Sequence, residues 1–334
     1  MNTKLAFAIA AVSVSMLASA QDAEVAERTA VLQKAEAAFR AGDFDDLNRQ
    51  VQTYMTTERR TKSGAFKIEQ FDDGISKGMN FRGADAESQH KDLVARTESW
   101  VLRYPEIPLA HVLHARALLA YAYYFRGSGY SNTVPPLAWA AFEKYAKQAA
   151  DVLLKSQEVA SAYTGWHATF INAARSLGWP KELVRRVLQD GVRRNPDDYR
   201  LYHHSLVYFL PKWHGSAEDV DGLIEYAEKS TVERHGLEIY ARLYSAAAEG
   251  QFKHRLYTDS SVKWQKMRQG LLDWNSRFPT EWNLNIFAYH ACIAQDKATT
   301  RDLLARIGGT PILRIWAPNS QVMFSTCQRF AAEP

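Results

Sequence analysis

One tripeptide pattern recurs along this chain: an arginine, any residue, and then a proline, each time after a stretch with helical spacing of apolar residues. The copies are Arg103-Tyr104-Pro105, Arg194-Asn195-Pro196 and Arg277-Phe278-Pro279. Proline steers the residue before it out of the helical region, so the preceding helix must end there. Arginine in a last turn suits the negative end of the helix dipole. Because proline is tolerated at the first position of a helix, we predict that each tripeptide is a joint where one helical hairpin ends and the next begins.

The spacing of these joints predicts a helical repeat protein. The prolines stand 91 and 83 residues apart (105 to 196, 196 to 279). Each interval encloses about two helical hairpins, which gives a unit of roughly 42–45 residues, as in known hairpin repeats. No window alternates with period two, so no sheet is expected. The predicted fold is all-α, a right-handed solenoid of six or seven hairpins that resembles tetratricopeptide (TPR) repeats.

The N-terminus has the pattern of a secretory signal peptide. Lys4 is followed by an apolar run over 5–17 and by the small-residue cleavage site Ala18-Ser19-Ala20. The run is shorter than the ~20 residues that a membrane span needs. We predict a cleaved signal peptide over 1–20 and a bacterial protein that is periplasmic or secreted.

The rest of the chain, 21–334, is predicted to form a single helical-repeat domain. Within it, residues 61–84 are expected to be irregular, because Gly64, Gly74, Gly78 and Gly83 interrupt them.

Charge and composition exclude some partners. The formal net charge is +4, and 46% of the residues are hydrophobic, which is ordinary for a globular protein with a large core. A net charge this small does not indicate a basic surface that binds nucleic acid. No second apolar run of signal-peptide length follows, so no membrane span is expected either.

Two cysteines in an oxidising compartment suggest a disulfide. Cys292 and Cys327 stand 35 residues apart (292 to 327) in predicted helices. A bridge would stabilise the fold by roughly 3–4 kcal/mol on the chain-entropy model. The alternative is a pair of unpaired, buried thiols.

Catalytic and metal-binding patterns are not found in the sequence. His111 and His114 share one helix face, but no carboxylate accompanies them in metalloprotease spacing. His203 and His204 are adjacent, so they diverge by about 100° on a helix. No nucleophile elbow or phosphate-binding loop occurs. We therefore predict no catalytic residue, no cofactor and no metal.

Two turns are the most distinctive segments for binding. The stretch 126–136 offers glycine N–H groups beside an arginine, which would suit an anion, although a left-handed helix cap at Gly127 explains the same residues. The turn 211–216 offers the aromatic face of Trp213 and the imidazole of His214 to a ligand. Alternatively, Trp213 fills the gap between neighbouring hairpins. The candidate binding residues are Tyr121, Tyr124, Arg126, Gly127, Gly129, Tyr130, Trp213 and His214.

Several of these segments resemble a bacterial domain-of-unknown-function family of exported TPR-like proteins. The similar stretches are Arg126-Gly127-Ser128-Gly129-Tyr130, Leu177-Gly178-Trp179, the turn 210–216 and the helix 285–296. The resemblance extends from about residue 35 to 310. It implies an all-helical fold and no assigned activity, and it provides no catalytic residues to transfer.

The predicted function is a non-enzymatic, exported scaffold that binds a protein or peptide in its concave groove. A first alternative is an envelope enzyme that acts on polysaccharide. A closed toroid with Tyr, His and Arg side chains converging in a deep cleft would favour that enzyme. A second alternative is an accessory or immunity-like partner of a secreted system.

Overall fold

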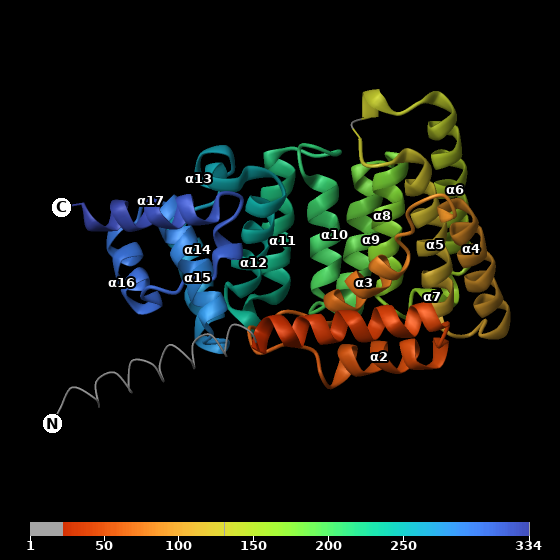
Figure 1. The fold of residues 1–334 in the computed structure, drawn as a ribbon, viewed down its shortest axis with the longest axis horizontal. Coiled ribbons are helices and arrows are strands. Elements are labelled where there is room, and N and C mark those ends of the chain that lie inside the picture. Colours follow the sequence, from red (N-terminus) through yellow and green to blue (C-terminus); the bar gives the residue numbers. More distant parts are fainter. Residues whose placement is uncertain (1–22, 130, 334) are drawn as a thin grey trace.

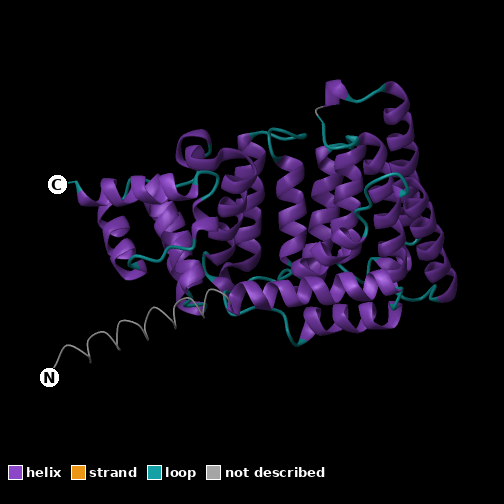
Figure 2. Cartoon of the chain, viewed as in Figure 1, coloured by secondary structure: helices purple, strands orange, loops and turns teal. Residues whose placement is uncertain are grey.

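The computed structural model describes residues 23–129 and 131–333, so the predicted signal peptide and Tyr130 lie outside the described residues. Within this part the chain is all-helical, as predicted, and its one β-feature is an isolated bridge between Arg60 and Phe66 (Figure 2). None of the described helices combines the length and the apolar character needed to cross a membrane.

The N-terminal helix covers residues 23–41. The other α-helices are α2 Phe44–Thr56, α3 Lys67–Gly78, α4 Ala86–Arg103, α5 Pro108–Arg126, α6 Pro136–Lys155, α7 Gln157–Ala160, α8 Gly165–Leu177, α9 Lys181–Arg194, α10 Tyr199–Phe209, α11 Ala217–His235, α12 Glu238–Ala247, α13 Leu256–Asp259, α14 Trp264–Arg277, α15 Glu281–Ile293, α16 Lys297–Ile307 and α17 Ser320–Ala332. A π-helix follows α12 over Ala248–Phe252, and a 3₁₀ turn over Leu313–Trp316 precedes α17.

From α4 onward, consecutive helices turn back on one another and form an open row (Figure 1). Helices α5, α8, α10 and α12 contact one another in that order and form an inner layer. These inner helices are buried on most sides, whereas α9 buries only a stripe, as an outer amphipathic helix does. The row does not close into a ring, because α6 and α17 lie at its opposite ends.

The predicted joints end helices, but their prolines do not begin the next ones. Helices α4, α9 and α14 end at Arg103, Arg194 and Arg277, and the following residue is extended, with φ between −128° and −150°. The next helices begin three or more residues after each arginine. Each joint thus marks the place where one helix ends and the next soon begins, as predicted.

Capping chemistry explains two of the later starts. The side chain of Asp198 accepts a hydrogen bond from the N–H of Arg200 at the start of α10. Thr280 likewise accepts from the N–H of Asn283 at the start of α15. Such a cap satisfies a backbone N–H of the first turn, so it favours a helix start at this residue. Helix α5 begins instead at Pro108, without a side-chain cap.

Residues 23–78, here called the N-terminal segment, contact all three joints. The ring of Phe44 stacks on Tyr104, with centroids 4.5 Å apart. Arg59 donates to the carbonyl oxygen of Asp197, 3.4 Å away. The indole of Trp274 donates to the carbonyl oxygen of Ser63, 3.1 Å away. The segment thus crosses the row of helices from α14 to α4.

Helix α3 corrects the expectation that residues 61–84 are irregular. Lys67–Gly78 form one continuous helix. A Cβ added at Gly74 would lie 2.3 Å from the carbonyl oxygen of Leu32, and one at Gly78 would lie 2.7 Å from the ring of Phe39. These glycines therefore allow close packing on the N-terminal helix and do not break α3.

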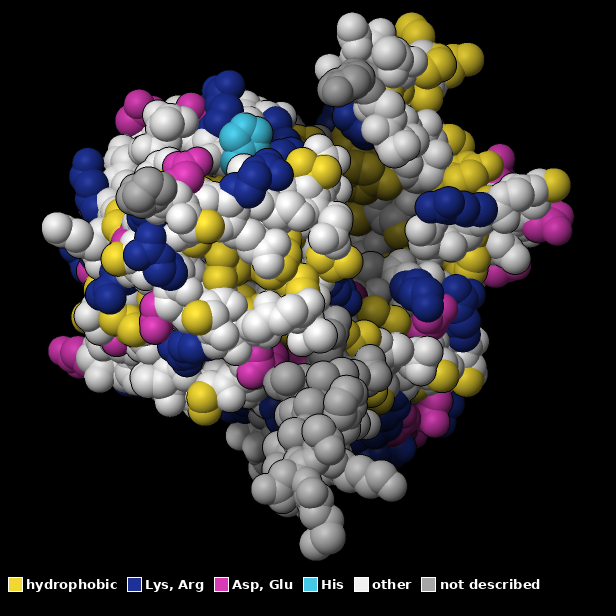
Figure 3. Space-filling model, turned by 60° about the vertical axis from the view of Figure 1, so that its left-hand side comes forward, with side chains coloured by type: hydrophobic (Ala, Val, Ile, Leu, Met, Phe, Trp, Pro, Cys, Tyr) yellow, Lys and Arg dark blue, Asp and Glu magenta, His cyan; other side chains and the backbone are white. Residues whose placement is uncertain are grey.

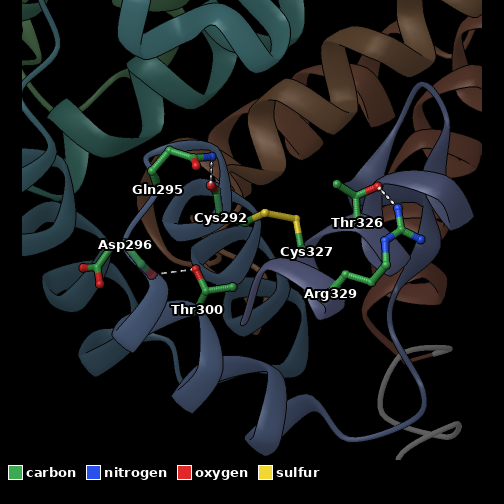
Figure 4. The surroundings of a disulfide bond; sticks show 7 residues. All are labelled: Cys292, Gln295, Asp296, Thr300, Thr326, Cys327 and Arg329. Atoms are coloured by element: carbon green, nitrogen blue, oxygen red, sulfur yellow. Dashed lines mark hydrogen bonds between the residues drawn. A yellow bond between two sulfur atoms is a disulfide. The ribbon is translucent and has the colours of Figure 1, made fainter. Parts of the chain in front are cut away.

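Near the C-terminus, a disulfide joins Cys292 of α15 to Cys327 of α17 (Figure 4). Their Cα atoms are 5.7 Å apart, and both side chains are buried. The loop that the bridge closes contains α16 and the turn with the fully buried Trp316. The bridge therefore ties the last helix to the row.

Candidate functional site

Two cavities remain between the N-terminal segment and the inner layer of helices. The first has a volume of about 550 Å³ and the second about 470 Å³. Both are bounded by Glu69 and Gln70 of α3 and by His203 of α10, so α3 separates them. The groove predicted from the sequence is thus partly filled by the chain itself.

The first cavity has the denser set of ionisable groups. They come from α3, α4, α5, α8 and α10 and from the turn before α8: Glu69, Asp72, Asp73, His90, Arg116, Tyr123, Tyr124, Tyr163, Arg175, Arg200, His203 and His204. On the face of the molecule in Figure 3, acidic and basic side chains are interspersed, and hydrophobic side chains line a hollow.

Arg200 lies in the floor of the first cavity and is 1% exposed. Its guanidinium donates to both carboxylate oxygens of Asp198, at 3.0 and 2.6 Å. It also donates to the hydroxyl of Tyr163 at 2.7 Å and to the Asp72 carboxylate at 3.2 Å. This buried charge is therefore fully paired and anchors α3 to α10.

Asp72 bridges two arginines. Besides Arg200, Arg116 of α5 donates to its carboxylate and, at 2.8 Å, to its backbone carbonyl. Burial raises the pKa of Asp72, but the charges of Arg116 and Arg200 outweigh burial and lower it. Asp72 is thus an ionised structural link.

Glu69 and Asp73 lie four residues apart on α3 and lack a strong partner. The Nδ1 of His203 lies 3.6 Å from the carboxyl of Glu69. Burial, with a contribution from Asp73, raises the pKa of Glu69 to about 8. Desolvation and then Asp72 raise the pKa of Asp73 to about 6. At neutral pH the cavity therefore holds a protonated carboxyl beside an ionised one.

The two adjacent histidines both reach the first cavity. His204 shares a hydrogen bond of 3.1 Å with the side-chain oxygen of Asn172. Burial and the neighbouring His203 lower the pKa of His204 to about 3, so it is neutral at physiological pH. Burial likewise lowers the pKa of His203, with Arg175 adding to the shift.

Arg175 has an unused guanidinium at the cavity. It lies over the ring of Trp213, 4.6 Å from the centroid. Its Nε has no hydrogen-bond partner in the described chain, and no ion pair joins it to an acid there. His214 shares a 2.7 Å hydrogen bond with the backbone carbonyl of Arg175. The predicted binding residues Trp213 and His214 therefore contact Arg175 but do not themselves line the cavity.

The predicted residues of α5 and its following turn do not converge on one site. Tyr124 lines the first cavity, whereas Tyr121 is buried beside it at 2% exposure. Arg126 donates to the carbonyl oxygens of Gly127 and Gly129 at 3.1 and 3.3 Å, so the turn satisfies its own arginine.

The glycine at the end of α5 has a positive φ but not a helical ψ. Gly127 has φ +67° and follows the last helical residue. Its ψ of −170° lies outside the left-handed helical region, so this residue is not the left-handed cap that the sequence suggested.

The sequence reasoning missed most residues of the first cavity. Asp72 and Arg200 are 128 residues apart, and only the crossing of the N-terminal segment brings them together. One available signal was Arg200 itself, a charge inside the aromatic and apolar helix Tyr199–Phe209.

The described histidines, cysteines and acids contain no group of three or more placed to hold a metal ion. No family model, curated protein or solved structure matches this chain.

Proposed function

We propose that this chain is an exported, non-enzymatic helical-repeat protein with a right-handed, TPR-like architecture, and that it binds a short peptide in the first cavity. The observation that carries the proposal is that one cavity contains a cation and an acid that form no ion pair in the described chain. Arg175 offers donors, and Asp73 offers acceptors. The signal-peptide pattern of residues 1–20 supports export.

A peptide end fits this arrangement better than a neutral ligand does. A free carboxylate would accept hydrogen bonds from Arg175, and a free ammonium would donate to Asp73. The protonated Glu69 and Asn172 would serve backbone amides between them. The volume of about 550 Å³ lies within the usual range for small-ligand pockets.

Calorimetric titration of the purified protein with three peptides tests the proposal: trialanine, N-acetyl-trialanine and trialanine amide. Trialanine should bind, and each blocked peptide should bind about tenfold more weakly, because each loses one charge-assisted contact. Arg175→Gln should remove the penalty for amidation. Asp73→Asn should remove the penalty for acetylation.

Arg186→Gln is the matched control, since Arg186 is exposed and does not line the cavity. It should retain both penalties. Absence of trialanine binding, or equal binding of all three peptides, would reject the proposal.

One observation favours the enzyme alternative enough to test it. The pKa of Glu69 is raised to about 8 while that of nearby Asp72 is lowered, and opposed shifts of this kind characterise acid–base pairs. The open row in Figure 1 is not the closed toroid that this alternative favours. Cleavage of acidic oligosaccharides that Glu69→Gln abolishes would replace peptide binding with catalysis as the function.

A further inference from the structure

The second cavity lies on the other side of Glu69 and Gln70, between α3, α12, α15 and the turn Leu313–Trp316. Its ionisable groups differ from those of the first cavity. Four cations line it, Arg28, Arg242, Arg314 and Lys253, against two acids, Glu69 and Glu249.

Two of the four cations are committed to protein acids. Arg28 donates to Glu24 at 2.6 Å, and the Nε of Arg242 donates to Glu238 at 2.7 Å. Within residues 23–129 and 131–333, no acid forms an ion pair with Arg314 or Lys253. Positive charge at the cavity is therefore in excess.

Aromatic rings hold the arginines in place. Arg314 lies 5.0 Å from the ring centroid of Trp282, and Arg28 lies 4.5 Å from the same centroid. Arg242 lies 3.9 Å from the ring centroid of Trp274. Guanidinium groups held in this way lose little freedom when they bind an anion.

A buried polar atom in the wall also has no protein partner. His290 is 2% exposed and lines the second cavity. Its Nε2 is 2.9 Å from the Ser245 hydroxyl, whereas its Nδ1 has no hydrogen-bond partner. A buried polar group without a partner is costly, which is consistent with a ligand or water that satisfies it.

The backbone at the rim is unusual. The π-helix Ala248–Phe252 contributes Ala248 and Glu249 to the cavity, and the next residue, Lys253, has φ +53°. π-Helical turns and left-handed non-glycine residues are both rare and occur often at functional sites. Here they place Lys253 at the mouth.

Part of the remaining wall is apolar. It includes Ala246, Ile286, Ile315 and Pro318. We propose that the second cavity binds a small organic carboxylate with an apolar body, with Arg314 and Lys253 pairing with the carboxylate. This site is separate from the peptide site and does not rest on it.

Octanoate, octanol and inorganic phosphate serve as probes, titrated into the purified protein while tryptophan fluorescence is recorded, since Trp274 and Trp282 line the cavity. Octanoate should bind, and octanol and phosphate should each bind at least about tenfold more weakly, because each lacks one half of the recognised ligand. Equal binding of octanol or of phosphate would overturn the proposal.

Arg314→Gln combined with Lys253→Gln should weaken octanoate binding at least about tenfold. Both side chains are exposed, so the fold should survive, and each single variant should show part of the loss. Arg255→Gln is the matched control, because exposed Arg255 pairs with Asp259 outside the cavity. Unchanged octanoate affinity in the double variant would overturn the proposal, and so would an equal loss in Arg175→Gln.

Discussion

Each of the two cavities has a buried arginine in its wall, and the two arginines differ in how the protein satisfies them. Arg200, in the first, bonds to Asp198, Asp72 and Tyr163. Arg242, in the second, bonds only through Nε to Glu238, and its Nη2 has no partner. The carboxylates differ too. Asp198 depends on Arg200 alone among charged groups, whereas Glu238 also pairs with Arg60 and Arg277 at 3.1 and 3.3 Å.

This difference distinguishes arginines that stabilise the fold from cations that remain available to a ligand. In the first cavity the arginine–acid network is complete, so the groups left for a ligand are Glu69, Asp73 and Arg175 around it. Beside the second, Glu238 pairs with three arginines, whereas Arg314 and Lys253 have no acid partner in the described chain. A complete network stabilises the fold, while surplus donors bind anions.

The largest expected effect comes from breaking the Arg200 network. Arg200→Leu leaves Asp198, which is 2% exposed, without a counter-charge, so the free energy of unfolding should fall by about 3–5 kcal/mol. Arg242→Leu should cost only about 1–2 kcal/mol, because Glu238 keeps two arginines. Urea denaturation measures both.

Arg193→Leu controls for loss of an arginine on the surface, since its side chain is 70% exposed. It should change the unfolding free energy by no more than about 0.5 kcal/mol. Equal losses for Arg200→Leu and Arg242→Leu would contradict the distinction between the two networks.

The disulfide should affect the cavities unequally. Replacing Cys292 and Cys327 by alanine removes a bridge across 35 residues and should cost roughly 3–4 kcal/mol. The turn with Arg314 lies inside that loop, so octanoate binding should weaken while trialanine binding stays the same. Reductant added to the unaltered protein should reproduce the loss, and an unchanged urea midpoint would argue against a stabilising bridge.

Gly64 tests how the N-terminal segment is held beside Arg242. It has φ +77°, and an added Cβ would lie 2.5 Å from the ring of Phe278 and 2.6 Å from Nη2 of Arg242. Gly64→Ala should cost about 3 kcal/mol, from backbone strain and overpacking together.

Gly83 has φ +94° with nothing within 4 Å of an added Cβ. Gly83→Ala therefore isolates the backbone strain and should cost about 1–2 kcal/mol in the same denaturation assay. If the two variants lose equal stability, the contact with Arg242 and Phe278 contributes nothing.

Local signals predicted the helices well, because they act within a few residues. The three arginine–proline joints end helices as expected, at Arg103, Arg194 and Arg277. Helix α3 was missed because glycines that pack against another helix look like glycines that end one. The distinction depends on the distant residue Leu32, about which local spacing holds no information.

The cavities were not predictable from spacing either. They arise where residues 23–78 lie against the inner helices, and the contacts that define them join residues over a hundred positions apart, as between Asp72 and Arg200. The sequence pointed instead to turns rich in glycine and tryptophan. One of these, Trp213-His214, contacts Arg175 in the wall of the first cavity.

The smallest predicted effect concerns Glu69, which borders both cavities. Its pKa is about 8 in the folded protein against 4.5 for the free group. Between these pH values the folded state retains a proton that the unfolded state has released, so stability falls as the pH rises. The slope is at most about 1.4 kcal/mol per pH unit, and it should be less here because water reaches the half-buried carboxyl.

Other groups oppose this trend at lower pH. His204 and His290 have pKa values of about 3 when folded, against 6.5 for the free group, so they make stability rise with pH up to about 6.5. The window from pH 6.5 to 8 is therefore where Glu69 should dominate. There, Glu69→Gln should make the unfolding free energy less dependent on pH than in the unaltered protein, because glutamine keeps the shape and has no proton to lose.

Urea denaturation at half-unit steps across this window measures the difference, with exposed Glu106→Gln as the control that should follow the unaltered protein. Asp73 and Asp198 raise the pKa of Glu69, whereas Arg242 and Arg200 lower it, so the Arg242→Leu background should move the effect to higher pH. Parallel curves for Glu69→Gln and the unaltered protein would mean that Glu69 is ionised at neutral pH. The second cavity would then lose part of its positive excess, and the comparison between the two cavities would weaken accordingly.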